Sequence, residues 1–251
     1  MDGPGYEDES VCTVGDSVYT RPDNEGECDM PDILEQLATC IERGKVNAKA
    51  PYPPDMKGEE GADELTKKAL EMKIPPSQLL EQSLIEGMGR VGKKFSEHKV
   101  FVPDLLMAAR AMSAAMEHLK PFFESGEARH IGTFVIGTVE GDLHDIGKNL
   151  VAMVMEGGGW KVIDLGVDVP PAKFMEALEE NPDAVVGLSA LLTTTMASME
   201  KTVKLIKENK PNTYIIVGGA PLTEGFAHKI GADAYGEDPQ SALNQLSAAA
   251  S

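Results

Sequence analysis

The feature that most constrains the fold is a regular alternation of strand-like and helix-like segments that begins near residue 130. Each expected strand is a short run rich in β-branched residues, and each expected helix has apolar residues at helical spacing. The strands are expected over Thr133–Val139, Lys161–Leu165, Ala184–Leu188, Thr213–Val217 and Ala232–Tyr235, and the helices over Ile146–Met155, Pro171–Glu179, Thr195–Glu208, Glu224–Ile230 and Pro239–Leu246. This pattern predicts a doubly wound five-stranded parallel α/β domain over residues 126–251, with ligands bound outside the carboxyl ends of its strands.

The preceding segment, residues 32–125, has helical spacing of apolar residues in four stretches joined by short links. The stretches are Asp32–Gly44, Asp63–Met72, Ser77–Phe95 and Pro103–Pro121. They predict a small four-helix bundle. Between the first two stretches, residues 47–61 contain three prolines and two glycines and are expected to form a loop. This loop is either a docking surface or a tolerated insertion, and we favour the insertion because long loops cost little stability.

Charge and composition exclude several classes of protein. The chain has 41 acidic and 23 basic residues and a net charge of -18, which disfavours binding to nucleic acids or anionic membranes. Residues 1–32 contain ten acids and one base, and residues 1–31 are expected to form an acidic flexible arm. No stretch is long and apolar enough to span a membrane, and no secretory signal is recognisable, so we expect a cytoplasmic protein. Cys12, Cys28 and Cys40 are expected to be free thiols.

The segment with the most chemistry, residues 140–149, follows the first expected strand and reads EGDLHDIGKN. A histidine here could bind a metal through one ring nitrogen while Asp142 accepts a hydrogen bond from the other. The alternative is that Asp142 or Asp145 caps the next helix and His144 is an ordinary exposed residue. A zinc site would need further ligands, so a lone histidine better suits a metal that a macrocycle already holds. A phosphate-accepting aspartate is also conceivable on this fold, whereas nucleotide-binding glycine motifs are missing.

Small residues follow two other expected strands at the same edge of the sheet. Ser189–Thr195 supplies hydroxyl groups after the third strand, and Gly218-Gly219-Ala220 follows the fourth. Together they could line a deep polar slot, although glycines and hydroxyls also end strands and cap helices in many α/β domains.

Three motifs in order carry a resemblance to a known family. Asp142-x-His144-x-x-Gly147 is followed after 41 residues by Ser189-x-Leu191, and after 26 more by Gly218-Gly219. This pattern resembles the signature of cobalamin-binding domains in corrinoid methyltransferases and related mutases. The bundle sequences LIEGMGRVGKKF and FVPDLLMAARAM resemble the helical cap of methyl-transferring corrinoid proteins. Over residues 30–251 the chain is therefore similar to corrinoid methyl carriers of methanol, methylamine or O-demethylase systems, and to the cobalamin-binding module of methionine synthase.

The resemblance implies a four-helix cap followed by a flavodoxin-like cobalamin-binding domain. It also implies that His144 is the metal ligand below the cobalt, with Asp142 and Thr195 as hydrogen-bonded partners that couple it to a proton. The implied contacts to the cofactor are Gly141, Asp142, His144, Asp145, Ile146, Gly147, Ser189, Leu191, Thr193, Gly218, Gly219 and Gly236, together with Phe101 and Met107 of the cap.

The resemblance further implies a cobalamin or related cobamide that cycles between methylcobalamin and cob(I)alamin. The protein would carry methyl between a substrate-specific and an acceptor methyltransferase, both with TIM barrels, and would need a reductive activator. It would itself be a non-catalytic subunit. The alternatives are a cobalamin-dependent sensor and the cobalamin subunit of a mutase. The acidic arm disfavours a DNA-binding sensor, and the helical cap disfavours a mutase. A moving cap would need a hinge, which we expect over Phe122–His130.

Overall fold

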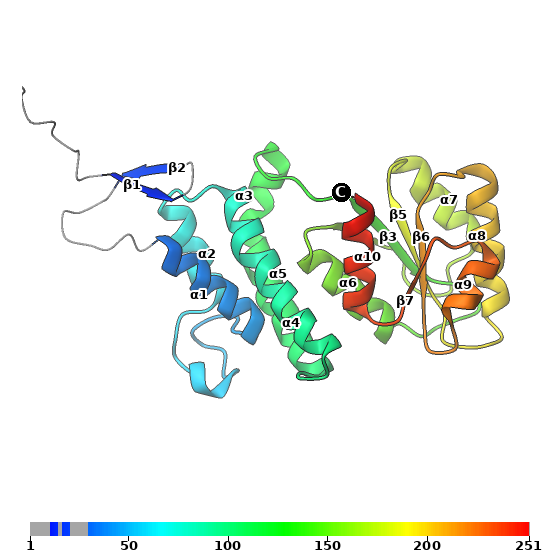
Figure 1. Ribbon diagram of the computed structural model, residues 1–251, viewed down its shortest axis with the longest axis horizontal. Helices are drawn as coiled ribbons and strands as arrows, with labels where there is room; N and C mark the ends of the chain where they lie inside the picture. Colours follow the sequence, from blue (N-terminus) through cyan, green and yellow to red (C-terminus); the bar gives the residue numbers. More distant parts are fainter. Residues whose placement is uncertain (1–10, 15–16, 21–29, 251) are drawn as a thin grey trace, which may run out of the picture.

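The computed structural model describes residues 11–14, 17–20 and 30–250 of the chain. A bundle of helices and a helix-covered sheet lie side by side (Figure 1). Two short strands, β1 (Val11–Val14) and β2 (Ser17–Thr20), pair antiparallel ahead of the bundle. They fall within the predicted acidic arm, whose residues 1–10, 15–16 and 21–29, including Cys28, lie outside the described part of the chain.

The bundle contains the four expected helical stretches. They are α1 (Met30–Arg43), α2 (Ala62–Glu71), a continuous run of α3 (Pro76–Leu79), the π-helical η2 (Leu80–Ile85) and α4 (Glu86–Ser96), and α5 (Val102–Ser125). Their apolar faces meet in a core that includes Leu37, Ile41, Leu65, Leu84 and Leu105, each at most 3% exposed. Burial of these apolar faces is the main force that holds the bundle together.

Helix α5 continues past Pro121, where the sequence predicted its end. Proline removes one backbone hydrogen bond, but Phe122 and Phe123 in the next turn pack against the buried cluster. The helix ends instead at Gly126, whose φ of +84° is left-handed. The expected hinge is therefore helical as far as Ser125, and the rest folds back so that the rings of His130 and Phe123 stack with centroids 4.2 Å apart.

The loop between α1 and α2, which includes the 3₁₀ turn η1 (Pro54–Met56), is tied to three helices. Arg43 of α1 forms an ion pair with Asp55 at 2.7 Å, and the Tyr52 hydroxyl donates to Asp104 of α5 at 2.9 Å. At its base, the Glu64 carboxylate of α2 accepts the backbone N–H groups of Ala48 and Gly61. These contacts fix the path of the loop.

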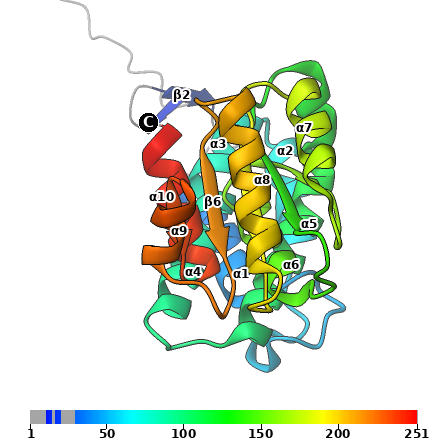
Figure 2. The same ribbon diagram turned by 90° about the vertical axis from the view of Figure 1, so that its right-hand side faces the viewer.

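The sheet has the predicted architecture. Strands β3 (Thr133–Thr138), β4 (Lys161–Asp164), β5 (Val185–Ser189), β6 (Ile215–Gly218) and β7 (Ala234–Gly236) are parallel, in the order β4-β3-β5-β6-β7. Helices α6 (Ile146–Gly157) and α10 (Pro239–Ala250) cover the face toward the bundle. Helices α7 (Pro171–Glu180), α8 (Met196–Asn209) and α9 (Glu224–Ile230) cover the other face (Figure 2). This is the doubly wound order in which ligands bind at the switch point.

Bundle and sheet share one buried cluster. Met88 of α4 packs where Gly157 of α6 has no side chain, and Gly92 of α4 lies in the same way against the Gln240 side chain of α10. The bundle thus lies against α6 and α10, beside the sheet. The β6 arrow in Figure 2 points to the same lower end of the molecule as the connection between α4 and α5. Within the described residues, no helix is long and apolar enough to cross a membrane.

Candidate functional site

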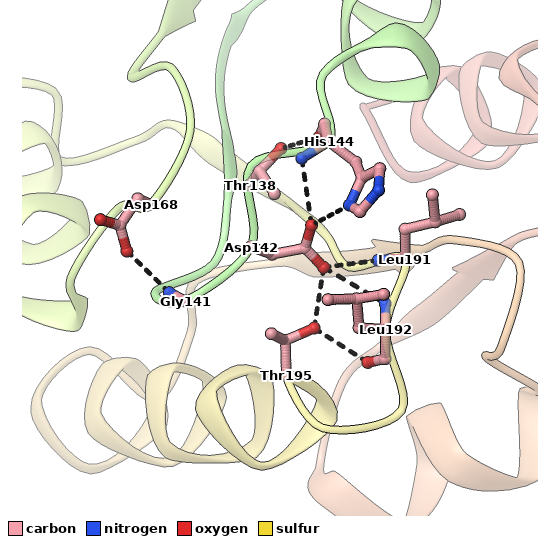
Figure 3. Close-up of polar contacts among 8 residues, drawn as sticks. All are labelled: Thr138, Gly141, Asp142, His144, Asp168, Leu191, Leu192 and Thr195. Atoms are coloured by element: carbon pink, nitrogen blue, oxygen red, sulfur yellow. Dashed lines mark hydrogen bonds and ion pairs between the residues drawn. The ribbon is translucent and has the colours of Figure 1, made fainter.

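The loop after β3 places a buried carboxylate beside a half-exposed histidine (Figure 3). Asp142 has no exposed side-chain surface, and its Oδ1 lies 2.7 Å from Nδ1 of His144. Its Oδ2 accepts hydrogen bonds from the backbone N–H of Leu191 and the Thr195 hydroxyl, both at 2.8 Å. The structure therefore brings together the three residues predicted to form the ligand system.

Burial alone would raise the pKa of the Asp142 carboxyl. Hydrogen bonds from the Leu191 N–H, the His144 side chain and backbone, and the Thr195 hydroxyl outweigh it and hold the pKa well below its usual range. Asp142 is therefore ionised at neutral pH. An ionised acceptor at Nδ1 favours the tautomer of His144 that carries its proton on Nδ1 and leaves the Nε2 lone pair available.

The His144 ring stands at the rim of the site with its side chain 50% exposed, and Figure 3 shows it directed away from the Thr195 side. Its backbone is also fixed, because the Thr138 hydroxyl donates to the His144 carbonyl at 2.9 Å. Four apolar side chains around His144 are unusually exposed: two close to it in sequence and two in the turn that donates to Asp142. They are Leu143, Ile146, Leu191 and Leu192, of which Leu143 and Ile146 are 72% and 80% exposed.

A cavity of about 450 Å³ opens at the same edge and runs between the sheet and helices α6 and α10. Five predicted contact residues line it: Gly147, Ser189, Gly218, Gly219 and Gly236. Gly219 has a φ of +138°, and a Cβ there would lie 1.8 Å from the Ala190 carbonyl oxygen. Only glycine fits this backbone, so the position next to the cavity stays free of side-chain atoms.

The other predicted contacts lie outside the lining of this cavity. Leu191 contributes its backbone N–H to Asp142, and the side chain of Thr193 is exposed. Gly141 and Asp145 lie on either side of His144, and the Asp145 carboxylate accepts from the Asn149 amide. In the bundle, the side chain of Phe101 is 69% exposed, and Met107 packs against Gly44.

Three residues around the loop were missed by the sequence analysis: Thr138, Asp164 and Asp168. Asp168 accepts the Gly141 N–H at 2.7 Å, and Asp164 pairs with the buried Lys148 at 2.5 Å. The position of the two aspartates could have been inferred, because Asp164 ends β4 and Asp168 follows it, and β4 is the strand next to β3 in a doubly wound sheet. Nothing in the sequence indicates which groups these side chains hydrogen-bond.

Comparison with known proteins agrees with this geometry. Residues 132–244 match a family described as a B12 binding domain, and residues 58–120 match a second B12 binding domain family. The chain is 41% identical to trimethylamine corrinoid protein 1 of Methanosarcina acetivorans over 76% of this chain and 90% of that protein. It is 38% identical to dimethylamine corrinoid protein 1 of the same organism over 84% and 94% of the two chains.

The chain belongs to the corrinoid protein family. Among solved structures, this corrinoid protein is similar to a chain of the methanol:cobalamin methyltransferase complex MtaBC of Methanosarcina barkeri. The TM-score is 0.73 and the identity 29%, over 87% of this chain and 80% of that one. It is also similar to a cobalamin-binding protein of Desulfitobacterium hafniense, with a TM-score of 0.67 and 28% identity over 85% and 98%. The predicted fold and the cobalt-containing corrinoid cofactor are thereby confirmed.

Proposed function

We propose that this corrinoid protein carries a methyl group on cobalt between two methyltransferases, and that the first of them takes the methyl group from a methylated amine. The support for an amine donor is the similarity to the tri- and dimethylamine corrinoid proteins, which extends over at least 90% of their lengths. The similarity to the methanol complex is lower, at 29% identity. Methanol is therefore the second donor to test.

The observation that carries the proposal is the pairing of a fully buried, ionised Asp142 with a half-exposed His144. In this arrangement His144 would hold the cobalt through Nε2. The exposed side chains of Leu143, Ile146, Leu191 and Leu192 would form an apolar seat for the macrocycle. The cavity lined by Ser189 and the glycines would take the nucleotide tail of the cofactor. These features fit a large ligand with one metal and one extended arm.

The residues of the chain hold the histidine and its proton. When bound, the corrinoid would supply the cobalt that carries the methyl group. Asp142 orients the ring by accepting a hydrogen bond from Nδ1–H, while Thr195 and the Leu191 N–H hold the carboxylate in place. Asp142 would thereby couple the proton on the His144 ring to the availability of Nε2 for the metal.

The remaining roles concern the bundle and the partner proteins. Phe101 and Val102 are exposed at the start of α5, where they would help to exclude water from the cofactor. We propose two methyltransferases with TIM barrels and a reductive activator as partners. The matches to corrinoid proteins extend through the bundle, which supports a carrier over the alternatives of a sensor or a mutase subunit.

The test is reconstitution of His144→Ala with hydroxocobalamin, with His228→Ala on α9 as the control. We expect His144→Ala to retain cofactor in the cavity but to lose the visible spectrum of the histidine-ligated form, and His228→Ala to keep that spectrum. An unchanged spectrum in His144→Ala would contradict the ligand assignment. Wild-type protein supplied with amine and methanol methyltransferases in parallel would identify the donor from the change in the cobalt spectrum.

A further inference from the structure

The loop that carries His144 is held at both ends by one neighbouring segment, the end of β4 and the residues after it. At the start of the loop, the Asp168 carboxylate accepts the Gly141 N–H at 2.7 Å, and the Asp168 N–H donates to the Asp142 carbonyl at 2.9 Å. Figure 3 shows Asp168 on the opposite side of the loop from the His144 ring. These two bonds fix the backbone immediately before the ligand pair.

At the other end of the loop, Lys148 in the first turn of α6 is 2% exposed and pairs with Asp164 at 2.5 Å. The second oxygen of Asp164 accepts the Gly166 N–H at 2.8 Å. The Gly166 carbonyl accepts the Thr138 N–H at 3.0 Å, and the Thr138 hydroxyl holds the His144 carbonyl. A continuous chain of hydrogen bonds therefore connects Asp164 to the backbone of the histidine.

Asp168 has an unfavourable backbone conformation, which its contacts to the loop help to maintain. Its φ is +54°, a left-handed conformation that non-glycine residues adopt at a cost. Asp168 keeps this conformation while both its carboxylate and its N–H bond to the loop. Lys148 is likewise a buried cation whose charge requires the Asp164 carboxylate.

We propose that Asp164 and Asp168, here called the loop clamp, are positioning residues that hold residues 141–148 in place before the cofactor binds. This inference rests on the proposed ligand role of His144. With the clamp intact, the imidazole already points its Nε2 outward, so little ordering of the loop is needed at binding. Without the clamp, the loop samples other conformations and the imidazole coordinates the metal less often. Gly147 and Lys148 are the part of the loop that lines the cavity, whereas the walls formed by β5, β6, β7 and α10 lie outside the loop and keep their shape.

The variants can separate the carboxylate contact from backbone strain. Asp168→Gly removes the contact and accepts the left-handed φ, whereas Asp168→Asn keeps an acceptor for Gly141 and tolerates that φ. Asp233→Ala is a matched control, because Asp233 also accepts a backbone N–H, that of Ile215, and pairs with a lysine, Lys207, both at 2.7 Å. Asp233 lies just before β7, the last strand in the order β4-β3-β5-β6-β7, and is therefore far from the loop after β3. Asp164→Ala tests the second half of the clamp.

Two measurements test the inference. Amide hydrogen exchange of the cofactor-free protein should be about tenfold faster over residues 141–148 in Asp168→Gly, as expected for loss of a hydrogen bond to a charged group. Electron paramagnetic resonance of cob(II)alamin bound to ¹⁵N-histidine-labelled protein reports imidazole coordination directly. Compared at equal amounts of bound cobalamin, the coordinated fraction should fall by at least half in Asp168→Gly and Asp164→Ala. Asp168→Asn should restore both readouts, and Asp233→Ala should leave both at wild-type values.

An Asp168→Gly protein with wild-type exchange over residues 141–148 and wild-type coordination would overturn the inference. An Asp233→Ala protein as strongly affected as Asp168→Gly would also overturn it, because the effect would then be general destabilisation. Absence of ¹⁵N coupling in the wild-type protein would instead contradict the ligand role of His144 in the proposed function. Exchange in the cofactor-free variants would then decide by itself whether the clamp orders the loop.

Discussion

Asp142 carries a buried negative charge, which hydrogen-bond donors from the surrounding loops stabilise. An unpaired carboxylate without exposed surface would be strongly destabilising. Here two backbone N–H groups after β5, the Thr195 hydroxyl and the His144 ring and N–H surround its two oxygens. The carboxyl end of one strand thus supplies the donors for a side chain that follows another strand. This explains why the first two sequence motifs are needed together.

The first prediction concerns Thr195, which is 5% exposed. Thr195→Val keeps the shape of the side chain but removes the donor to Asp142 while the backbone donors remain. We expect cobalamin affinity to fall about tenfold, at the low end for loss of a group that supports a metal ligand. Equilibrium titration with hydroxocobalamin measures this. The control is Thr202→Val on α8, the helix that follows Thr195, because it removes a hydroxyl bonded only within its own helix. Equal affinities for the two variants would contradict the role of Thr195.

The second prediction concerns Cys40, the one cysteine with a described side chain, which is free and 2% exposed. Burial raises the pKa of this thiol to about 11. The reactive thiolate should therefore be scarce at pH 8, and iodoacetamide should label Cys40 at least about a hundredfold more slowly in the native protein than in urea. Peptide mass spectrometry follows the label. Equal rates in the two conditions would show that Cys40 is accessible.

The motif residues were predictable because they follow strands, and carboxyl ends of parallel strands meet at one edge. Residues that act through hydrogen bonds to the backbone, such as Thr138 and Asp168, were not. Their side chains are of common types in loops, and their partners are set by the path of the chain in three dimensions. The free-thiol prediction is confirmed for Cys40, and the side chains of Cys12 and Cys28 lie outside the described residues.

At the scale of elements, the strands were located to within about two residues because their apolar runs are short and distinct. The ends of helices were less predictable. Helix α5 passes Pro121 because tertiary packing of Phe122 and Phe123 outweighs one lost backbone bond. The loop of residues 47–61 was recognised from its prolines, yet its anchors to α1, α2 and α5 depend on side chains far away in sequence.

The third prediction tests one of these anchors, the hydrogen bond from Tyr52 to Asp104. Tyr52→Phe should lower the free energy of unfolding by about 1 kcal/mol, the typical net contribution of a hydrogen bond. Asp104→Ala should cost more, because Asp104 also accepts the Phe101 N–H at the start of α5. A double-mutant cycle by urea denaturation should give a coupling energy near 1 kcal/mol. Strictly additive changes would show that the loop is not tied to α5 through this pair.

At the scale of the whole molecule, bundle and sheet are joined by a seam of glycines and larger apolar side chains. Gly157, the last residue of α6, admits Met88 of the bundle, and on the sheet side of the seam Gly158 admits Leu243 and Gly132 admits the ring of Trp160. The orientation of the two parts could not be predicted from helical periodicity, because each pattern defines an apolar face without its partner. The bundle also packs against α6 and α10, the two helices that border the cavity, and so helps to hold them on the sheet.

The last prediction uses Trp160, the single tryptophan, as a probe of this seam. Trp160 is 3% exposed and belongs to the cluster shared by bundle and sheet. Met88→Ala should lower the free energy of unfolding by about 2 to 5 kcal/mol, since it removes a buried side chain. The midpoints from Trp160 fluorescence and circular dichroism should shift together, because the shared core couples the two parts.

The control is Met153→Ala on the exposed side of α6. Met153 is 37% exposed, so this change should alter the free energy of unfolding by about 0.5 kcal/mol or less. A fluorescence transition well before the loss of helix would mean that the seam opens independently, and that bundle and sheet are separate cooperative units.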